Sequence, residues 1–164
     1  MRGLTFAVLL AVVIATASPV TGAEWGGVIP GESTKETVRA RHGEPTRATT
    51  QKVDKYDSLQ WVYEGQQAPT GMFRMTIDFG LAVASGFRPD VVRSFKLEPH
   101  PGIFVRPAII DGWGRPSGAA PAGQPPAFFY ESGLLVYFDK DGWEVQSMVF
   151  TPPQPSGGQA APQR

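Results

Sequence analysis

The sequence predicts an α+β fold made of two tandem units, each a short helix followed by a three-stranded antiparallel sheet. Turn residues recur at one separation in two parts of the chain, and runs of alternating apolar and polar residues follow both sets. Nineteen Gly and sixteen Pro among 164 residues also favour many turns and short strands over long helices. We therefore expect one unit over residues 24–99 and a second over residues 100–151.

Each predicted unit begins with a Pro-Gly pair and continues with a Gly-x-Pro triplet. Each of these residues in the second unit lies 71 positions after its counterpart in the first, as Pro101 does after Pro30. The matching residues are Pro30, Gly31, Gly43 and Pro45 in the first unit and Pro101, Gly102, Gly114 and Pro116 in the second. Val38 and Ile109 match in the same register. Several matches in one register indicate an internal duplication.

The helix of the first unit is predicted to begin near Ser33 and to end at about His42. Ser33 and Glu36 have the spacing of a capping box, in which the Ser33 hydroxyl accepts from a free helical N–H group and Glu36 reaches back to the Ser33 N–H group. Gly43 can adopt the left-handed conformation that ends a helix, and Pro45 prevents its continuation.

The helix of the second unit is predicted to be weaker, within residues 108–113. Pro107 must lie in its first turn, and an interior glycine such as Gly112 costs about 1 kcal/mol relative to alanine. We expect this helix to be as short as a single turn.

Six strands are predicted from the alternation of apolar and polar residues. They are expected at residues 61–64, 73–79 and 91–97 in the first unit, and at 128–131, 134–138 and 145–150 in the second. The strand at 134–138 is apolar on both faces, and Asp139 to Gly142 predict a hairpin turn after it. Loops are expected at residues 65–71 and 115–126, and a disordered tail rich in Pro, Gly and Gln at residues 152–164.

The N-terminus is typical of a secretory signal peptide, predicted over residues 1–23. Arg2 precedes an apolar run at residues 4–14, and small residues that suit signal peptidase follow it. Cleavage is expected after Ala17 or Ala23, with the second preferred. The alternative is an uncleaved membrane anchor or a buried helix, although the apolar run is short for a membrane span.

Composition narrows the classes of partner. Fifteen basic residues balance fifteen acidic residues, so no charge bias points to nucleic acid or to an anionic membrane. The chain has no cysteine, which excludes disulfides, a thiolate nucleophile and a lipid-accepting cysteine. We expect a periplasmic or secreted protein without a stable membrane anchor. The sequence does not fix the oligomeric state.

The start of the first unit resembles the SmpA/OmlA (BamE-like) family of bacterial envelope proteins. The residues that carry the resemblance are Pro30, Gly31, Ser33 or Thr34, Val38, Gly43 and Pro45. The tandem arrangement is similar to the architecture of the beta-lactamase inhibitor protein, in which two such units align their sheets into one concave surface. The resemblance covers residues 28–151, and it implies a fold that is commonly used to hold another protein.

The candidate chemical groups favour structural roles. His42 takes the position that Trp113 fills in the second unit, which suggests packing, and His100 stands in the linker between the units. Asp139 and Asp141 resemble the start of a calcium loop, but the twelfth position is Phe150. We therefore predict that the protein is not an enzyme and that it needs no metal or cofactor.

Four aromatic residues are the predicted partner-binding site. We expect these residues on the sheet face opposite the helix; they are Tyr130, Tyr137, Trp143 and Phe150. Exposed aromatic clusters suit protein interfaces, where Tyr and Trp supply much of the binding free energy. The alternative is that they close the core between the two units, since the period alone does not assign the face.

The sequence thus predicts an exported binding protein whose partner is another envelope or secreted protein. Two alternatives stay open. One is a secreted enzyme inhibitor of the beta-lactamase inhibitor protein type. The other is a small-molecule or lipid carrier with its ligand between sheet and helices, suggested by the two-sided apolar strand that begins at Leu134.

Overall fold

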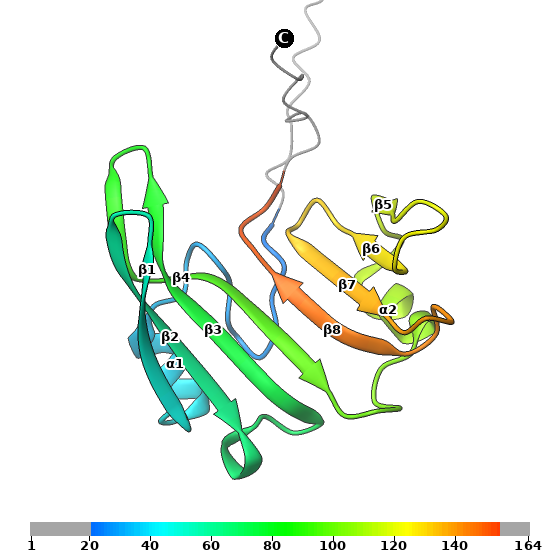
Figure 1. Cartoon of the computed structure of the whole chain (residues 1–164), viewed down its shortest axis with the longest axis horizontal. Coiled ribbons are helices and arrows are strands. Elements are labelled where there is room, and N and C mark those ends of the chain that lie inside the picture. The colour runs from blue at the N-terminus through cyan, green and yellow to red at the C-terminus, as the bar shows by residue number, and fades with distance from the viewer. Residues whose placement is uncertain (1–20, 155–164) are drawn as a thin grey trace, which may run out of the picture.

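Eight strands pair into one antiparallel sheet in the order β1-β2-β3-β4-β8-β7-β6-β5 (Figure 1). The computed structural model describes residues 21–154. The strands are β1 (Arg47–Val53), β2 (Tyr56–Glu64), β3 (Met72–Val83), β4 (Gly86–Pro99), β5 (Gly118–Ala119), β6 (Ala127–Phe129), β7 (Leu134–Phe138) and β8 (Val145–Phe150). The helices are α1 (Lys35–His42) and α2 (Arg106–Trp113), and a single 3₁₀ turn, η1 (Gly65–Gln67), follows β2.

The predicted fold class of two tandem units with three strands each is wrong. β4 and β8 pair directly, so that all strands belong to one sheet, and β1 and β5 are additional strands at its two ends. Phe95 of β4 lies opposite Phe150 of β8, and their rings stack with centroids 4.4 Å apart. Burial of these two rings at the junction favours a continuous sheet over two separate ones.

Both helices lie behind the sheet in the view of Figure 1. Val38 of α1 and Ile109 of α2 are fully buried and belong to the core. The sheet contributes its inward-facing side chains to the same core. The largest of these are Tyr63, Met75, Ile77, Phe79, Phe95, Leu97, Leu134, Met148 and Phe150. The helices therefore cover one face of the sheet, and within residues 21–154 no other element covers the opposite face.

The first helix is capped by Thr34 and not by Ser33 as predicted. The Thr34 side chain accepts from the N–H group of Thr37 at 3.5 Å. Ser33 instead closes the preceding turn, because its hydroxyl accepts from the Ile29 N–H group at 2.9 Å and its own N–H group donates to the Ile29 carbonyl. Glu36 therefore does not meet a free Ser33 N–H group, and the predicted capping box is wrong. The end at His42 is confirmed.

The second helix has eight residues, as the first does, so the prediction of a single turn is wrong. Pro107 is tolerated because it is the second helical residue, where its missing N–H group would have no intrahelical acceptor. Gly112 lies in the last turn, where it disrupts little. Gly114 ends α2 with φ of 79° and donates to the Ile110 carbonyl at 2.8 Å.

The strand predictions are confirmed most closely in β7 and β8, which have the predicted limits. β2, β3 and β4 are longer than predicted, whereas β6 ends at Phe129. Nothing in the sequence pattern predicted β1, or β5 within the expected loop at residues 115–126. The predicted turn at Asp139 is present, with the Gly142 N–H group donating to the Asp139 carbonyl at 2.9 Å.

Most of the predicted signal peptide and tail lies outside the described residues, at 1–20 and 155–164. Ala23 is buried in the core, and its N–H group donates to the Ser132 carbonyl at 2.8 Å. At the other end, the Gln154 N–H group donates to the Glu131 carbonyl at 2.8 Å. Within residues 21–154, neither α1 nor α2 has the length and apolar character needed to cross a membrane.

Candidate binding surface

On the face of the sheet away from the helices, one row of paired residues crosses all eight strands. From β1 to β5 the row is Arg47, Val62, Thr76, Lys96, Val149, Leu135, Phe129 and Gly118. Paired residues point to the same side of a sheet, and the residues next to them in sequence point to the other side. Because Ile77, Phe95 and Phe150 point into the core, this row points away from it. We call this side the uncovered face.

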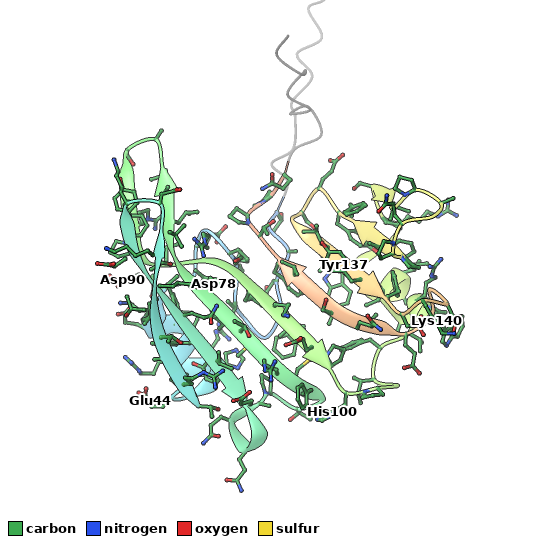
Figure 2. The ribbon with its side chains drawn as sticks, viewed as in Figure 1. Glu44, Asp78, Asp90, His100, Tyr137 and Lys140 are labelled. Atoms are coloured by element: carbon green, nitrogen blue, oxygen red, sulfur yellow. The ribbon has the colours of Figure 1, made fainter. Side chains whose placement is uncertain are left out.

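The part of the uncovered face formed by β6, β7 and β8 is mostly apolar, with Ser147 of β8 as a polar member. Phe129, Leu135, Tyr137 and Val149 form what we call the apolar patch. Phe129 and Tyr137 are 38% and 37% exposed, while Leu135 and Val149 are half-buried. Figure 2 shows Tyr137 on β7, away from Asp78 on β3. Large side chains that remain this exposed in a sheet indicate a surface suited to contact another molecule.

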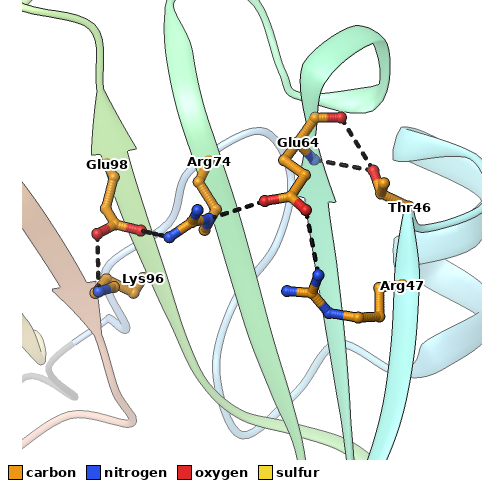
Figure 3. Close-up of polar contacts among 6 residues, drawn as sticks. All are labelled: Thr46, Arg47, Glu64, Arg74, Lys96 and Glu98. Atoms are coloured by element: carbon orange, nitrogen blue, oxygen red, sulfur yellow. Dashed lines mark hydrogen bonds and ion pairs between the residues drawn. The ribbon is translucent and has the colours of Figure 1, made fainter.

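The part formed by β1 to β4 carries charges of alternating sign, which we call the charged ladder (Figure 3). Its members are Arg47, Glu64, Arg74, Glu98 and Lys96. Glu64 contacts the guanidinium groups of Arg47 at 3.3 Å and Arg74 at 3.1 Å. Arg74 also contacts Glu98 at 3.5 Å, and Glu98 contacts the Lys96 ammonium at 3.0 Å.

The charged ladder is held in place more firmly than isolated surface ion pairs. Glu64, Arg74 and Glu98 each contact two oppositely charged groups. Thr46 adds two backbone contacts, because its hydroxyl accepts from the Glu64 N–H group and donates to the Glu64 carbonyl, both at 3.0 Å. Exposed ion pairs contribute little to stability, so the main effect of the network is to orient its charges.

Asp78 anchors a second polar group beside the charged ladder. Its Oδ1 atom accepts from the side-chain amides of Gln51 at 3.1 Å and Gln60 at 2.9 Å. The Arg93 guanidinium lies 4.0 Å from the same oxygen. These contacts extend the polar half of the uncovered face from β1 to β4.

Two of the four aromatic residues predicted to bind a partner do not lie on the uncovered face. Phe150 is fully buried against Phe95, and Tyr130 is 8% exposed with its hydroxyl bonded to the Gly114 carbonyl. Placing these two on an exposed surface was wrong. Tyr137 belongs to the apolar patch, and Trp143 is 54% exposed at the turn before β8.

The hairpin register explains this division. Phe150 pairs with Leu134, and Tyr137 lies three residues further along β7, so Tyr137 and Phe150 point to opposite faces. Phe129, Leu135 and Val149 were missed, although the register that pairs Leu135 with Val149 would have identified them.

The repeated turn residues have structural roles. Gly43 and Gly114 end their helices with φ of 75° and 79°. Gly31 has φ of 86° and donates to the Val92 carbonyl at 2.8 Å. The four prolines and Gly102 lie in the adjoining turns. Pro30 is buried, Pro45 and Pro116 are half-buried, and Pro101 and Gly102 are exposed. None of these residues lies in the row that defines the uncovered face.

The two histidines lie apart in the fold. His42, in the last turn of α1, stacks on Trp25 and meets the edge of Tyr63, both at centroid distances of 6.2 Å. Burial lowers the pKa of His42 and raises the pKa of Tyr63 to about 12. His100 is exposed beside Phe73 in a surface pocket of about 370 Å³ next to the charged ladder. Residues 21–154 contain no group of three potential metal ligands.

No protein-family model and no curated protein matches the chain. Among solved structures, it is similar to a DUF4309 family protein (YjgB) from Bacillus subtilis subsp. subtilis str. 168, with 12% sequence identity. The match covers 77% of this chain and 82% of that chain, with a TM-score of 0.46. The sheet topology, and not this similarity, shows that the expected resemblance to the SmpA/OmlA family and to the tandem inhibitor architecture is wrong. One large antiparallel sheet replaces the expected helix-plus-sheet units.

Proposed function

We propose that this protein is a non-enzymatic, exported binding protein that holds another envelope or secreted protein on the uncovered face of its sheet. The observation that supports this proposal is the juxtaposition of the apolar patch and the charged ladder on one face that neither α1 nor α2 covers. Export is supported by the apolar run at residues 4–14.

The two halves of the uncovered face suit different parts of a protein interface. Aromatic side chains such as Phe129 and Tyr137 supply much of the binding free energy when a partner buries them. Fixed charges such as those of Glu64 and Arg74 supply orientation and discrimination between partners. A complementary partner would place apolar side chains against the apolar patch. It would place a charge of opposite sign against each charge of the charged ladder.

A packed interior argues against the carrier alternative. Leu134 and Val136, whose strand suggested a ligand site between sheet and helices, are fully buried in the core. A macromolecule can bind the uncovered face without a cavity.

Site-specific photo-cross-linking tests the location of the binding surface. A photoreactive phenylalanine analogue replaces Phe129 or Tyr137, and the matched control carries it at Ile110 of α2, which is 36% exposed. After irradiation in an extract of the source envelope and medium, positions 129 and 137 are expected to capture one discrete protein that position 110 does not. Equal capture at all three positions would contradict the proposed surface.

The captured protein then allows a quantitative test with the purified pair. Truncating Phe129 and Tyr137 together to alanine is expected to weaken binding by at least about tenfold, the effect of losing about 1.4 kcal/mol. Ile103→Ala with Ile110→Ala is the matched control, because both residues are exposed and neither belongs to the apolar patch. Unchanged calorimetric affinity in the first double variant would exclude the patch.

Export has a separate test. Residues 1–23 are fused to a reporter enzyme that needs disulfides and is therefore active only outside the reducing cytosol. The fusion is expected to give activity, and replacing Leu9 and Leu10 by arginine is expected to abolish it by interrupting the apolar run. Equal activity of both fusions would contradict export by this segment.

A further inference from the structure

We propose that the free edge of β1 pairs with the β1 strand of a second copy of this chain, joining two sheets into one. This dimer depends on the edge of the sheet alone and does not require the uncovered face to bind another protein.

β1 is a long and regular edge strand. All seven of its residues pair with β2 in continuous register, from Arg47 with Val62 to Val53 with Tyr56. β1 ends the sheet, as Figure 1 shows, and within residues 21–154 no strand pairs with its other side. Every side chain from Arg47 to Lys52 is exposed. Its outer edge therefore presents unpaired backbone N–H and C=O groups that can extend the sheet.

The opposite edge of the sheet is protected in a way that β1 is not. β5 has only two residues, Gly118 and Ala119, and prolines precede and follow it at Pro116 and Pro121. Short strands and nearby prolines are common devices against pairing between edges. β1 contains no proline or glycine, and its pairing with β2 shows no bulge.

The charges of β1 are directed toward β2. Arg47 forms an ion pair with Glu64 at 3.3 Å, and Lys52 forms one with Asp57 at 2.7 Å. The stretch between these two cations, residues 48–51, is Ala-Thr-Thr-Gln and carries no charge. An edge lysine usually discourages strand addition, but here both cations stand near the ends and are partnered within the chain.

The β1 sequence is complementary to itself when two copies run antiparallel about Thr50. Thr50 then lies opposite the partner's Thr50, Thr49 opposite the partner's Gln51, and Arg47 opposite the partner's Val53. All seven residues pair, and no like charges face each other. Moving the register by one residue in one direction places Arg47 opposite the partner's Lys52, which like-charge repulsion disfavours. Moving it in the other direction leaves Arg47 unpaired and shortens the pairing to residues 48–53. Charge and the length of the pairing together favour a two-fold dimer centred on Thr50.

Such a dimer has a defined consequence for the rest of the molecule. Continuous antiparallel pairing preserves the alternation of side chains across the junction. The uncovered faces of both copies therefore lie on the same side of the extended sheet, and both sets of helices lie on the other. If the proposed function is correct, the dimer presents two binding surfaces to one partner or assembly.

A charge-exchange experiment tests the dimer and its register together. Thr50 is exposed and central, so Thr50→Lys and Thr50→Glu are expected to fold normally while placing two like charges opposite each other. In sedimentation equilibrium, wild type is expected to show a reversible doubling of mass with concentration, and each variant to lose it. An equimolar mixture of the two variants is expected to regain the dimer, because lysine then faces glutamate.

Thr50→Val is the matched control, since valine keeps the branched shape and adds no charge, and it is expected to retain the dimer. Circular dichroism confirms that all variants are folded. The proposal is overturned if wild type remains monomeric across the concentration series. It is also overturned if a dimer persists in Thr50→Lys, or if the mixture of folded variants stays monomeric.

Discussion

Tyr63 and Tyr130 tie the two helices to the sheet by the same contact, each hydroxyl donating to the carbonyl of a helix-ending glycine at 3.1 Å. Tyr63 reaches Gly43 after α1, and Tyr130 reaches Gly114 after α2. Burial raises the pKa of both phenols, which keeps the donating proton in place. The two halves of the one sheet therefore secure their helices by equivalent hydrogen bonds.

Removing either hydroxyl is expected to lower the free energy of unfolding by about 1 kcal/mol, the usual net value of a hydrogen bond. Tyr63→Phe and Tyr130→Phe are compared with wild type by urea denaturation. Tyr137→Phe is the control, because Tyr137 is exposed and makes no hydrogen bond of this kind within residues 21–154. Equal effects of all three changes would contradict the role of the two glycine contacts.

His42 is expected to make stability depend on pH near neutrality. Burial lowers the pKa of His42 below its ordinary 6.5, so the unfolded state binds the proton more readily than the folded state. The contribution of neutral His42 to the free energy of unfolding is fully present above pH 6.5. It is lost as the pH falls through the lower pKa of His42 in the folded state. Denaturation at a series of pH values should show a smaller decrease on acidification in His42→Phe, and an identical decrease would contradict this assignment.

Phe150→Ala is expected to lower the free energy of unfolding much more than Trp143→Ala does. Phe150 is fully buried, so its truncation should cost about 3–5 kcal/mol of unfolding free energy. Trp143 is more than half exposed, and its truncation should change stability by no more than about 0.5 kcal/mol. Chemical denaturation measures both values. Comparable losses would mean that Phe150 is not a core residue.

The charged ladder should contribute little stability and should respond to salt. Arg74→Met keeps the aliphatic stem but removes the cation shared by Glu64 and Glu98. The loss is expected to be at most about 1 kcal/mol at low ionic strength, and smaller at high ionic strength because salt screens exposed charges. A loss that is independent of salt would indicate packing rather than charge.

The position of Ala23 predicts how the N-terminus contributes to stability. A chain that begins at Glu24 lacks the buried Ala23 side chain and its hydrogen bond to the Ser132 carbonyl. Compared with a chain that begins at Thr21, it is expected to lose on the order of 1–2 kcal/mol. Denaturation compares the two chains. No difference would mean that this contact is not maintained in solution.

The limits of β7 and β8 could be predicted from the sequence because a turn from Asp139 to Gly142 separates two short apolar segments. β1 was missed because that strand is exposed on both sides and carries no apolar period. Phe150 was predicted on the wrong face because β7 is apolar on both faces. Only the pairing of Phe150 with Leu134 shows which face of the hairpin is buried. The single sheet could not be foreseen because the pairing of β4 with β8 joins distant segments.

The junction of β4 and β8 also sets an order of assembly. Three pairs of residues form it, from Phe95 with Phe150 to Leu97 with Met148. Residues 98–147 lie between Leu97 and Met148 along the chain. Closing so long a segment carries an entropic cost that neighbouring hairpins avoid, so the local pairs β1–β2, β2–β3 and β7–β8 can form first. The middle of the sheet is then completed last, after the end of β8 has been synthesised. Until that moment both halves expose the apolar edge that the finished protein conceals.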